Sequence, residues 1–363
     1  MASLDFETEK NNFRKFYDDY KDEHRQRVLI MEQLLGAILG EKFEGQIAIS
    51  SRLKDREECI QKFSRKYQKN LENEEKDYEI KNYITDLYGL RVVCSYEDEI
   101  EKIVKILENE FEVIEKTDKV KQIESESNLF GYKGIHLDVQ LKPERLDMIE
   151  YKKCDQNRFE IQIRTITQDA WSTIDHSINY KKDIPLYLKR RVMTLAALFE
   201  LADHEFLSIR DKTAAYIEEA KEAVLRKDYN ENEEINALNF QVFLDDEFKD
   251  SNFTFNSKKV DGFVSEIKGM SENKLTLGIC KQMIDDFRKD ISEYKKYLQD
   301  EKKVSDLNPF TEFRHMLFLY NNELYKDILF DLQRKNFEEW MELKHSDSIE
   351  HSDGIEHSDG IVS

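Results

Sequence analysis

Apolar residues recur at three- and four-residue intervals over much of this chain, and this spacing predicts helices. The first such stretch runs from about Asp5 to Leu39, and Gly36 and Gly40 bracket its end. The same spacing returns over residues 99–111, 166–182 and 186–224. We therefore expect a helical N-terminal segment over residues 1–45 and further helices among and after the strands.

Shorter stretches are rich in β-branched residues or alternate between apolar and polar residues, and these predict strands. They are Gln46–Ile49, Leu90–Tyr96, Phe111–Ile114, Ile135–Gln140 and Phe159–Thr165. The polar segments 116–128 and 143–157 are expected to be loops. Because a helical stretch separates two of the strands, the order predicts a mixed sheet with at least one covering helix. The fold class is therefore α/β (α+β), a mixed β-sheet flanked by helices and followed by a mostly helical C-terminal region.

The strand FEIQIRT, Phe159–Thr165, has the clearest alternation. Its apolar residues would face the core, while Glu160, Gln162 and Arg164 share the opposite face. An acid, an amide and a guanidinium side by side suit the floor of a site for a charged ligand. The alternative is a half-buried strand with an ordinary solvated face.

A change of composition at residues 226–234, RKDYNENEE, predicts a linker between an α/β domain over 46–225 and a helical unit over 235–344. The tail, 345–363, repeats six residues as HSDSIE, HSDGIE and HSDGIVS. It has no core-forming capacity and is expected to be disordered. Metal capture by its three histidines, His345, His351 and His357, is the alternative.

Charge and composition narrow the classes of function. The 363 residues are 39% apolar and 36% charged, with a formal net charge of −20, which argues against general nucleic-acid binding and against an anionic membrane surface. The N-terminus lacks a basic and apolar leader, and no run of about 18 apolar residues occurs. Four scattered cysteines signal neither a zinc site nor a disulfide framework, so a cytoplasmic protein is expected.

The most basic part of this acidic chain follows the first predicted strand. It carries Arg52, Lys54, Lys62 and Arg65, and a helix beginning near Asp55 would bring several of these cations together. Such a cluster suits a polyphosphate. A solvated basic helix is the alternative reading of the same residues.

Five motifs now fall in one order along the chain. They are RLK with Lys62, D-x-x-G-x-R at Asp86–Arg91, GYxxxH at Gly131–His136, ExQxRT at Glu160–Thr165 and WxxxxH with YK from Trp171 to Lys181. Together they resemble the synthetase domain of the RelA/SpoT family, the enzymes that make the alarmones ppGpp and pppGpp. The resemblance covers roughly Ala48 to Lys182, the size of a small alarmone synthetase with a nucleotidyltransferase-like fold. No histidine motif of the family's hydrolase domain precedes it.

The resemblance implies a GTP pyrophosphokinase, a transferase of the stringent response. It would move pyrophosphate from ATP to the ribose 3′-hydroxyl of GDP or GTP and release AMP, with Mg2+ as cofactor. Asp86 and Glu160 are the implied catalytic residues and metal ligands. The implied ATP-binding residues are Arg52, Lys54, Lys62 and Arg65. The implied acceptor-binding residues are Tyr132, Lys133, His136, Gln162 and Arg164.

Some features depart from the family pattern or leave alternatives open. Glu58 stands where many members carry a small hydroxyl residue near ATP, so it must turn away from phosphate. A toxin-like relative that pyrophosphorylates the 3′ end of tRNA, restrained by its C-terminal region, is one alternative. A catalytically silent nucleotide-binding regulator is another. The family resemblance also implies self-association into a homo-oligomer through helices outside the sheet.

Overall fold

The computed structural model describes residues 3–43, 46–118, 134–154, 157–179, 185–229, 233–270, 275–304 and 306–353. The chain divides into two compact units, Met1–Arg210 and Asp211–Ser363, called here the first unit and the second unit. The division falls inside helix α9, Leu186–Arg226. The linker predicted at 226–234 begins where α9 ends, and its role as a domain boundary stays a prediction.

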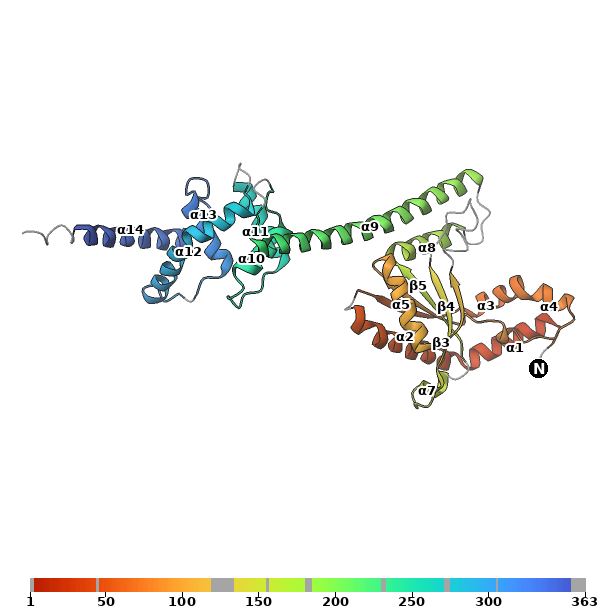
Figure 1. Ribbon diagram of the computed structural model, residues 1–363. Helices are drawn as coiled ribbons and strands as arrows, with labels where there is room; N and C mark the ends of the chain where they lie inside the picture. Colours follow the sequence, from red (N-terminus) through yellow and green to blue (C-terminus); the bar gives the residue numbers. More distant parts are fainter. Residues whose placement is uncertain are drawn as a thin grey trace, which may run out of the picture. The chain divides into compact units, whose positions relative to one another are not determined.

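The first unit is built on a five-stranded mixed sheet with the strand order β1-β2-β5-β4-β3 (Figure 1). Its strands are β1 Ala48–Leu53, β2 Tyr88–Cys94, β3 Phe111–Asp118, β4 Ile135–Leu141 and β5 Phe159–Thr165. Only β2 and β5 run parallel, and the other three neighbouring pairs are antiparallel. The predicted fold class is thereby confirmed.

One face of this sheet is apolar and is covered by helices. Helix α2, Lys21–Phe43, contacts β1 and β2, and helix α5, Glu97–Glu110, contacts β2, β3 and β5 (Figure 1). Buried residues of both helices join those of the strands in one hydrophobic core, which includes Leu35, Leu107 and Ile161. Burial of such side chains contributes about 1.5–3 kcal/mol each, so the covered face anchors the sheet. The opposite face is left for polar side chains.

The N-terminal segment is helical as predicted, but it forms two helices, α1 Phe6–Asp19 and α2. The break is at Tyr20, whose backbone leaves the helical region. Helix α2 then continues through Gly36 and Gly40 to Phe43, whereas the glycines were expected to bracket its end. A glycine lowers the stability of a helix by only about 1 kcal/mol, and the burial of a neighbour such as Leu39 stabilises the helix by more than that.

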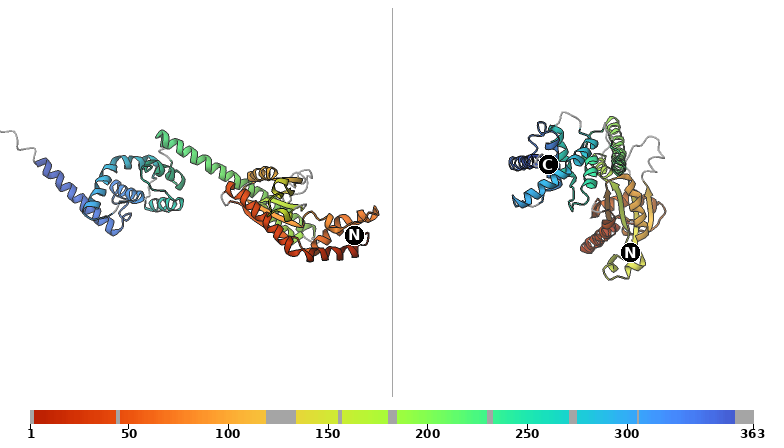
Figure 2. Two further views of the ribbon diagram at one scale, coloured as in Figure 1. Left: turned by 90° about the horizontal axis from the view of Figure 1, so that it is seen from below. Right: turned by 60° about the vertical axis from the view of Figure 1, so that its left-hand side comes forward.

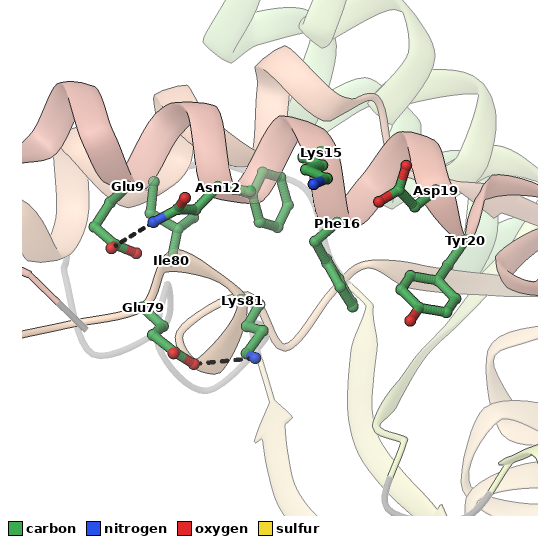
Figure 3. A pocket seen from close by; sticks show the side chains of 10 residues that line it. Glu9, Asn12, Lys15, Phe16, Asp19, Tyr20, Glu79, Ile80 and Lys81 are labelled. Atoms are coloured by element: carbon green, nitrogen blue, oxygen red, sulfur yellow. Dashed lines mark hydrogen bonds and ion pairs between the residues drawn. The ribbon is translucent and has the colours of Figure 1, made fainter. Parts of the chain in front are cut away.

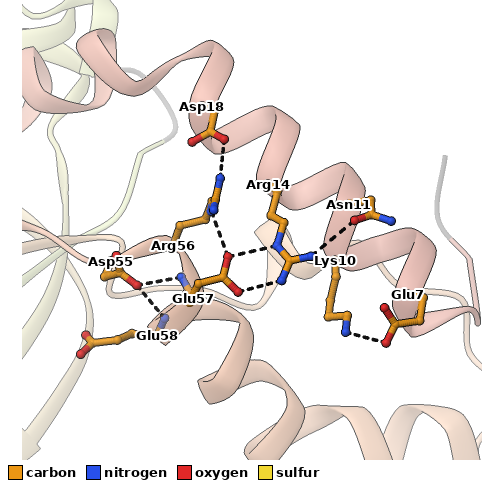
Figure 4. A network of polar contacts seen from close by, with 9 residues as sticks. All are labelled: Glu7, Lys10, Asn11, Arg14, Asp18, Asp55, Arg56, Glu57 and Glu58. Atoms are coloured by element: carbon orange, nitrogen blue, oxygen red, sulfur yellow. Dashed lines mark hydrogen bonds and ion pairs between the residues drawn. The ribbon is translucent and has the colours of Figure 1, made fainter.

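The basic stretch folds as helix α3, Arg56–Phe63, a π-helical turn η1, Ser64–Gln68, and helix α4, Lys69–Asn73. Asp55 caps α3, because its side chain accepts hydrogen bonds from the amides of Glu57 and Glu58. Figure 4 shows how α1 is tied to α3: Arg14 forms a two-point ion pair with Glu57. In the same view the Glu58 side chain points away from this network.

Several predicted boundaries shift. The first strand lies at Ala48–Leu53 rather than at Gln46–Ile49, and β3 continues to Asp118 into the predicted loop. The loop predicted at 143–157 contains two short helices, α7 Pro143–Leu146 and the 3-10 helix η3 Lys152–Cys154. Another 3-10 helix, η2 Ile80–Asn82, precedes β2. Short one-turn helices leave little periodic signal in a sequence.

Two helices follow β5. Helix α8, Ile166–Asn179, packs Trp171 against Phe199 of α9, with ring centroids 5.6 Å apart. The buried carboxylate of Asp203 on α9 accepts a 2.6 Å hydrogen bond from the Thr165 hydroxyl at the end of β5. The helix therefore fixes the end of the strand that carries Glu160.

The second unit is helical, as predicted (Figure 2). After α9 it contains α10 Ala237–Glu247, α11 Ser257–Met270, α12 Leu277–Asp300, α13 Pro309–Tyr320 and α14 Asp331–Asp353. Its core is rich in aromatic residues, of which Phe240, Phe313 and Phe337 are completely buried. Helix α14 reaches Asp353, so the tail predicted to be disordered from residue 345 is helical over its first part. Extending an existing helix costs much less than starting one, which explains the difference.

All four cysteines, Cys59, Cys94, Cys154 and Cys280, are buried and free. Burial raises the pKa of each thiol, to about 12 for Cys59 and Cys94. Among the described residues, no helix combines the length and the apolar character that crossing a membrane requires.

Candidate active site

Strand register brings the polar side chains of four strands to one face of the sheet. Glu160 lies opposite Gly89 on one neighbour and opposite Asp138 on the other. Residues paired across strands point to the same side, so the shared face can be read from the register. We call it the polar face. Its members are Arg52, Gly89, Arg91, His136, Asp138, Glu160, Gln162 and Arg164.

Glu160 is held as a carboxylate on this face. Its Oε1 lies 3.1 Å from Nδ1 of His136, and Nε2 of Gln162 donates to its Oε2 at 2.8 Å. Burial would raise the pKa of Glu160, but the hydrogen bonds from His136 and Gln162 and the nearby charges of His136 and Lys62 lower it to about 2. The acid therefore stays ionised at any physiological pH.

Asp86 lies in the turn before β2 and binds two lysines. Nζ of Lys54 is 2.5 Å from Oδ2, and Nζ of Lys62 is 2.9 Å from Oδ1. All three side chains are largely buried, with exposed fractions of 12–18%. The charge of Lys62 also contributes to lowering the pKa of Glu160. Lys62 thus pairs directly with Asp86 and acts electrostatically on Glu160, the two acids predicted from the sequence.

Lys54 is positioned by its own backbone. Its amide donates to the carbonyl of Leu87 at 3.0 Å, and its carbonyl accepts a 2.9 Å hydrogen bond from the Tyr17 hydroxyl of α1. The N-terminal helix thereby helps to fix the cation that reaches Asp86. This contact could not be predicted from the sequence, because it joins segments that are far apart in the chain.

A pocket of about 200 Å3 opens beside the polar face, next to Arg52 and Gly89. A Cβ added at Gly89 would lie 3.3 Å from Cγ of Arg52, so the glycine makes room for this arginine. Arg91 and Gln162 also line the pocket, together with Ser50, Ser51 and Leu90. The exposed guanidinium of Arg52 is free to lie over a planar ring in this space.

Arg164 is engaged by the protein itself. It is buried, and it donates to Gln162 at 2.7 Å, to Ser172 at 2.9 Å and to Asp169 at 3.3 Å. Burial first, and then the charge of nearby Arg91, lower its pKa to about 10, so it remains a cation. These contacts favour a role in positioning Gln162 over direct contact with an acceptor.

Asp138 is a second acid on the polar face, beside Glu160, and the family motifs do not include it. Its Oδ1 is buried and has no hydrogen-bond partner among the described residues. Burial first, and then the charge of Glu160, raise its pKa to about 6. The alternation of His136, Asp138 and Gln140 along the strand was the signal that could have identified it.

Replacing Asp138 with asparagine is expected to stabilise the first unit above pH 7. The folded-state pKa of about 6 exceeds the unfolded value of 3.8, so the folded state binds the extra proton between these values and stability falls as pH rises through the window. Relative to wild type, we expect the free energy of unfolding to rise by about 1–3 kcal/mol at pH 8 and hardly at all near pH 4. Chemical denaturation at pH 8 and at pH 4, without divalent metal, measures this difference. Equal gains at both values would contradict the titration.

The structure says less about the other site residues predicted from the sequence, Arg65, Tyr132 and Lys133. Arg65 is exposed on the π-helical turn η1, one turn beyond Lys62. Tyr132 and Lys133 lie outside the described residues. Within the part of the chain that is described, no three histidine, cysteine or acidic side chains are grouped closely enough to hold a metal ion by themselves.

Comparison with known proteins points to one family. Residues 51–185 match the model for the region found in RelA / SpoT proteins. The GTP pyrophosphokinase YwaC of Bacillus subtilis is 31% identical over 134 residues, which cover 36% of this chain and 60% of that protein. The GTP pyrophosphokinase YjbM of the same organism is 33% identical over 146 residues, covering 39% of this chain and 63% of that protein. The chain thus spans somewhat less than two thirds of the length of these relatives.

Solved structures of similar proteins include the small alarmone synthetase 1 of Bacillus subtilis, with 24% identity, a TM-score of 0.45, and coverage of 55% of this chain and 99% of that one. A structure of the same protein bound to its product pppGpp has 26% identity and a TM-score of 0.43, covering 55% and 98% of the two chains.

The family model begins within β1 and includes β2, β3, β4 and β5, and with them Asp86 and Glu160. Residues 51–185, which carry the polar face, are therefore similar to the region found in RelA / SpoT proteins.

Proposed function

We propose that the first unit transfers pyrophosphate from ATP to the 3′-hydroxyl of GDP or GTP, producing ppGpp or pppGpp and AMP. The observation that carries this proposal is the placement of the two acids: Asp86 pairs with Lys62 at 2.9 Å in the turn before β2, and Glu160, on the polar face, also feels the charge of Lys62. Binding alone does not require two ionised acids among cations. Both curated relatives are named GTP pyrophosphokinase, which supports the same reaction.

The donor side of the site would be formed by the cations. Arg52 would lie over the adenine ring in the pocket beside Gly89, while Lys54 and Lys62 would meet the phosphates. Arg65 lies one helical turn further on and would add charge at the outer end of the triphosphate. Triphosphate binding would replace part of the contact that the lysines now make with Asp86.

The acceptor side would be formed by β4, β5 and the segment before β4. His136 and Gln162, which hold Glu160, are placed to contact the acceptor ribose or its phosphates. The resemblance assigns guanine stacking to Tyr132 and phosphate contact to Lys133. Arg164 would support this side by holding Gln162.

Mg2+ fits the donor set of the two acids. This ion favours carboxylate oxygens, keeps several waters and binds readily through one or two acids plus substrate phosphates. Asp86 and Glu160 would hold it, and the phosphates of ATP would complete a site that the protein alone does not provide. When bound, it would neutralise charge on the transferring phosphates.

The chemistry asks mainly for positioning and charge neutralisation. The acceptor's 3′ oxygen forms a bond to the β-phosphorus of ATP, the bond from that phosphorus to the α–β bridging oxygen breaks, and AMP leaves. Glu160, ionised and fixed by two hydrogen bonds, would accept the hydroxyl proton or orient the hydroxyl for attack. Lys54 and Lys62 would stabilise the charge that develops on the phosphates.

The setting follows from the reaction and is also proposed. An alarmone synthetase would act in the stringent response, in the cytoplasm. A homo-oligomer is supported by apolar side chains that stand exposed on α8 and α9, including Ile166, Leu195 and Leu198.

A product assay on the full-length chain tests the function. The protein is incubated with ATP labelled in its β-phosphate, with Mg2+, and with GDP, GTP or deacylated tRNA in separate reactions. We expect label in a guanosine tetra- or pentaphosphate and an equal amount of AMP. An Asp86→Asn variant serves as the control that should give neither. Label on tRNA alone would establish the toxin-like alternative, and no label in any acceptor would contradict pyrophosphate transfer.

A further inference from the structure

A second pocket in the first unit, of about 590 Å3, is larger than the one beside Gly89 and belongs to none of the roles assigned above. It opens among α1, the start of α2, the segment from Lys81 to Tyr88 and the residues before β5. A volume of this size is typical of small-molecule sites. Its lining residues are Phe13, Phe16, His24, Arg27, Lys81, Asn82, Ile84, Thr85, Leu87, Tyr88, Asn157 and Arg158.

Every charged residue in this lining is a cation. Arg27 is fixed by hydrogen bonds to the carbonyl of Lys153 at 2.6 Å and to Glu23 at 3.2 Å. Lys81 pairs with Glu79 at 3.0 Å and keeps a side chain that is 46% exposed. Arg158 is exposed and forms no ion pair within the described part of the chain. Arg27 and Lys81 are each paired with one acid outside the lining, so Arg158 is the cation left to be compensated, and a lining with cations and no acid favours an anionic ligand.

His24 adds an unsatisfied donor to the same lining. Its Nδ1 lies 3.2 Å from the guanidinium of Arg27 and 2.8 Å from the hydroxyl of Tyr88. Because arginine can only donate, Nδ1 must be the acceptor and the hydrogen is on Nε2. This Nε2 is buried and has no hydrogen-bond partner among the residues described. Burial lowers the pKa of His24 to about 4, so the ring is neutral and its N–H needs an acceptor.

Aromatic rings form the other part of the lining. Phe16 packs edge-on against His24, with centroids 5.2 Å apart, and Nζ of Lys81 lies 5.9 Å from the Phe16 ring centre. Figure 3 shows Phe16 hanging from α1 beside Lys81, in an adjoining pocket of about 290 Å3 that shares these two residues. A ring next to cations suits a ligand that combines a planar group with an anion.

We propose that this pocket binds a nucleoside monophosphate, with the phosphate near Lys81 and Arg158 and the base among the rings of Phe16 and Tyr88. The site lies apart from the polar face, but part of its lining comes from the segment from Thr85 to Tyr88, which leads into β2 and contains Asp86. Leu87, in the lining, accepts the hydrogen bond of the Lys54 amide, and Thr85, also in the lining, lies close enough to Asp138 to lower the pKa of that carboxyl slightly. A ligand bound here would therefore contact the turn that carries Asp86.

Calorimetric titration of the full-length chain, without ATP or Mg2+, tests the proposal. The probes are uridine monophosphate, whose base neither proposed substrate contains, adenosine monophosphate and inorganic phosphate. The variant Lys81→Gln with Arg158→Gln removes two exposed cations from the pocket. The matched control is Lys105→Gln, an exposed lysine on α5 that lines neither this pocket nor the adjoining one. We expect at least one nucleotide to bind, about tenfold more weakly in the double variant, as for two lost charge-assisted contacts, and unchanged in the control.

Hydrogen exchange locates the bound nucleotide. Protection is expected in peptides covering Phe13–Arg27 and Asn82–Tyr88. The proposal is overturned if neither nucleotide binds, if the double variant binds as well as wild type, or if protection is confined to residues 48–62, 135–141 and 160–164. Phosphate binding as tightly as the nucleotides would overturn the nucleotide assignment. None of these results depends on pyrophosphate transfer.

Discussion

Replacing Glu160 with glutamine is expected to lower the rate of pyrophosphate transfer by about a thousandfold while leaving the fold intact. The amide can still accept the hydrogen bond that Gln162 donates, so the strand should keep its geometry. What is lost is the negative charge, which the surroundings of Glu160 maintain by lowering its pKa to about 2. Initial rates of alarmone formation, measured at saturating ATP and acceptor, give the size of the effect.

The matched control is Glu112→Gln, the same change on exposed Glu112 of β3, in the same sheet. It should leave both the rate and the thermal unfolding unchanged. If Glu160→Gln kept more than about a tenth of wild-type activity, Glu160 would neither accept the proton nor hold the metal, since such groups contribute about a hundredfold or more.

Replacing Lys62 with glutamine is expected to lower kcat by about a hundredfold. The lysine contacts Asp86 at 2.9 Å, and its removal takes away a cation that stabilises charge on the phosphates. Its effect on the pKa of Glu160, which is about 2, is smaller than those of His136 and Gln162, so Glu160 stays ionised in the variant. The loss of activity should therefore be the same at pH 6 and at pH 8.

Lys105→Gln on helix α5 is the control, because this exposed lysine lies outside the polar face. It should leave the kcat profile unchanged. A loss of activity that grew markedly from pH 8 to pH 6 would contradict this expectation, because it would mean that Glu160 needs Lys62 to stay ionised. A rise in KM for ATP with kcat unchanged would restrict Lys62 to ground-state binding.

The central strand and its polar face could be predicted from the sequence because both follow from alternation. Phe159, Ile161 and Ile163 are fully buried, while Glu160 and Gln162 lie on the other side of β5. A period of two is a local property, so it survives without knowledge of the neighbouring strands.

Cross-strand and helix-to-strand contacts could not be predicted in this way. That Asp138 lies opposite Glu160 depends on the register of β4 against β5. The hydrogen bond from Thr165 to Asp203 depends on how α9 packs on the end of β5. Local periodicity does not determine the strand order or the pairing of distant helices. Asp138 was missed although its alternation with apolar residues was visible in the sequence.

Helix ends were also less predictable than helix positions. Gly36 and Gly40 are weak local signals, and the packing of Leu35 and Leu39 carries α2 past them. At the other end of the chain, α14 extends into the polar repeat as far as Asp353. In both cases the energy of the neighbouring structure outweighs the preference of single residues.

The burial of all four cysteines makes the chain its own reporter of unfolding. A thiol with a raised pKa and no exposure reacts with an alkylating reagent only after the surrounding structure has opened. Cys59, Cys94 and Cys154 report on the first unit, and Cys280 alone reports on the second. Mass-spectrometric counting of labelled thiols in rising urea would thus show whether the two units melt together or one after the other.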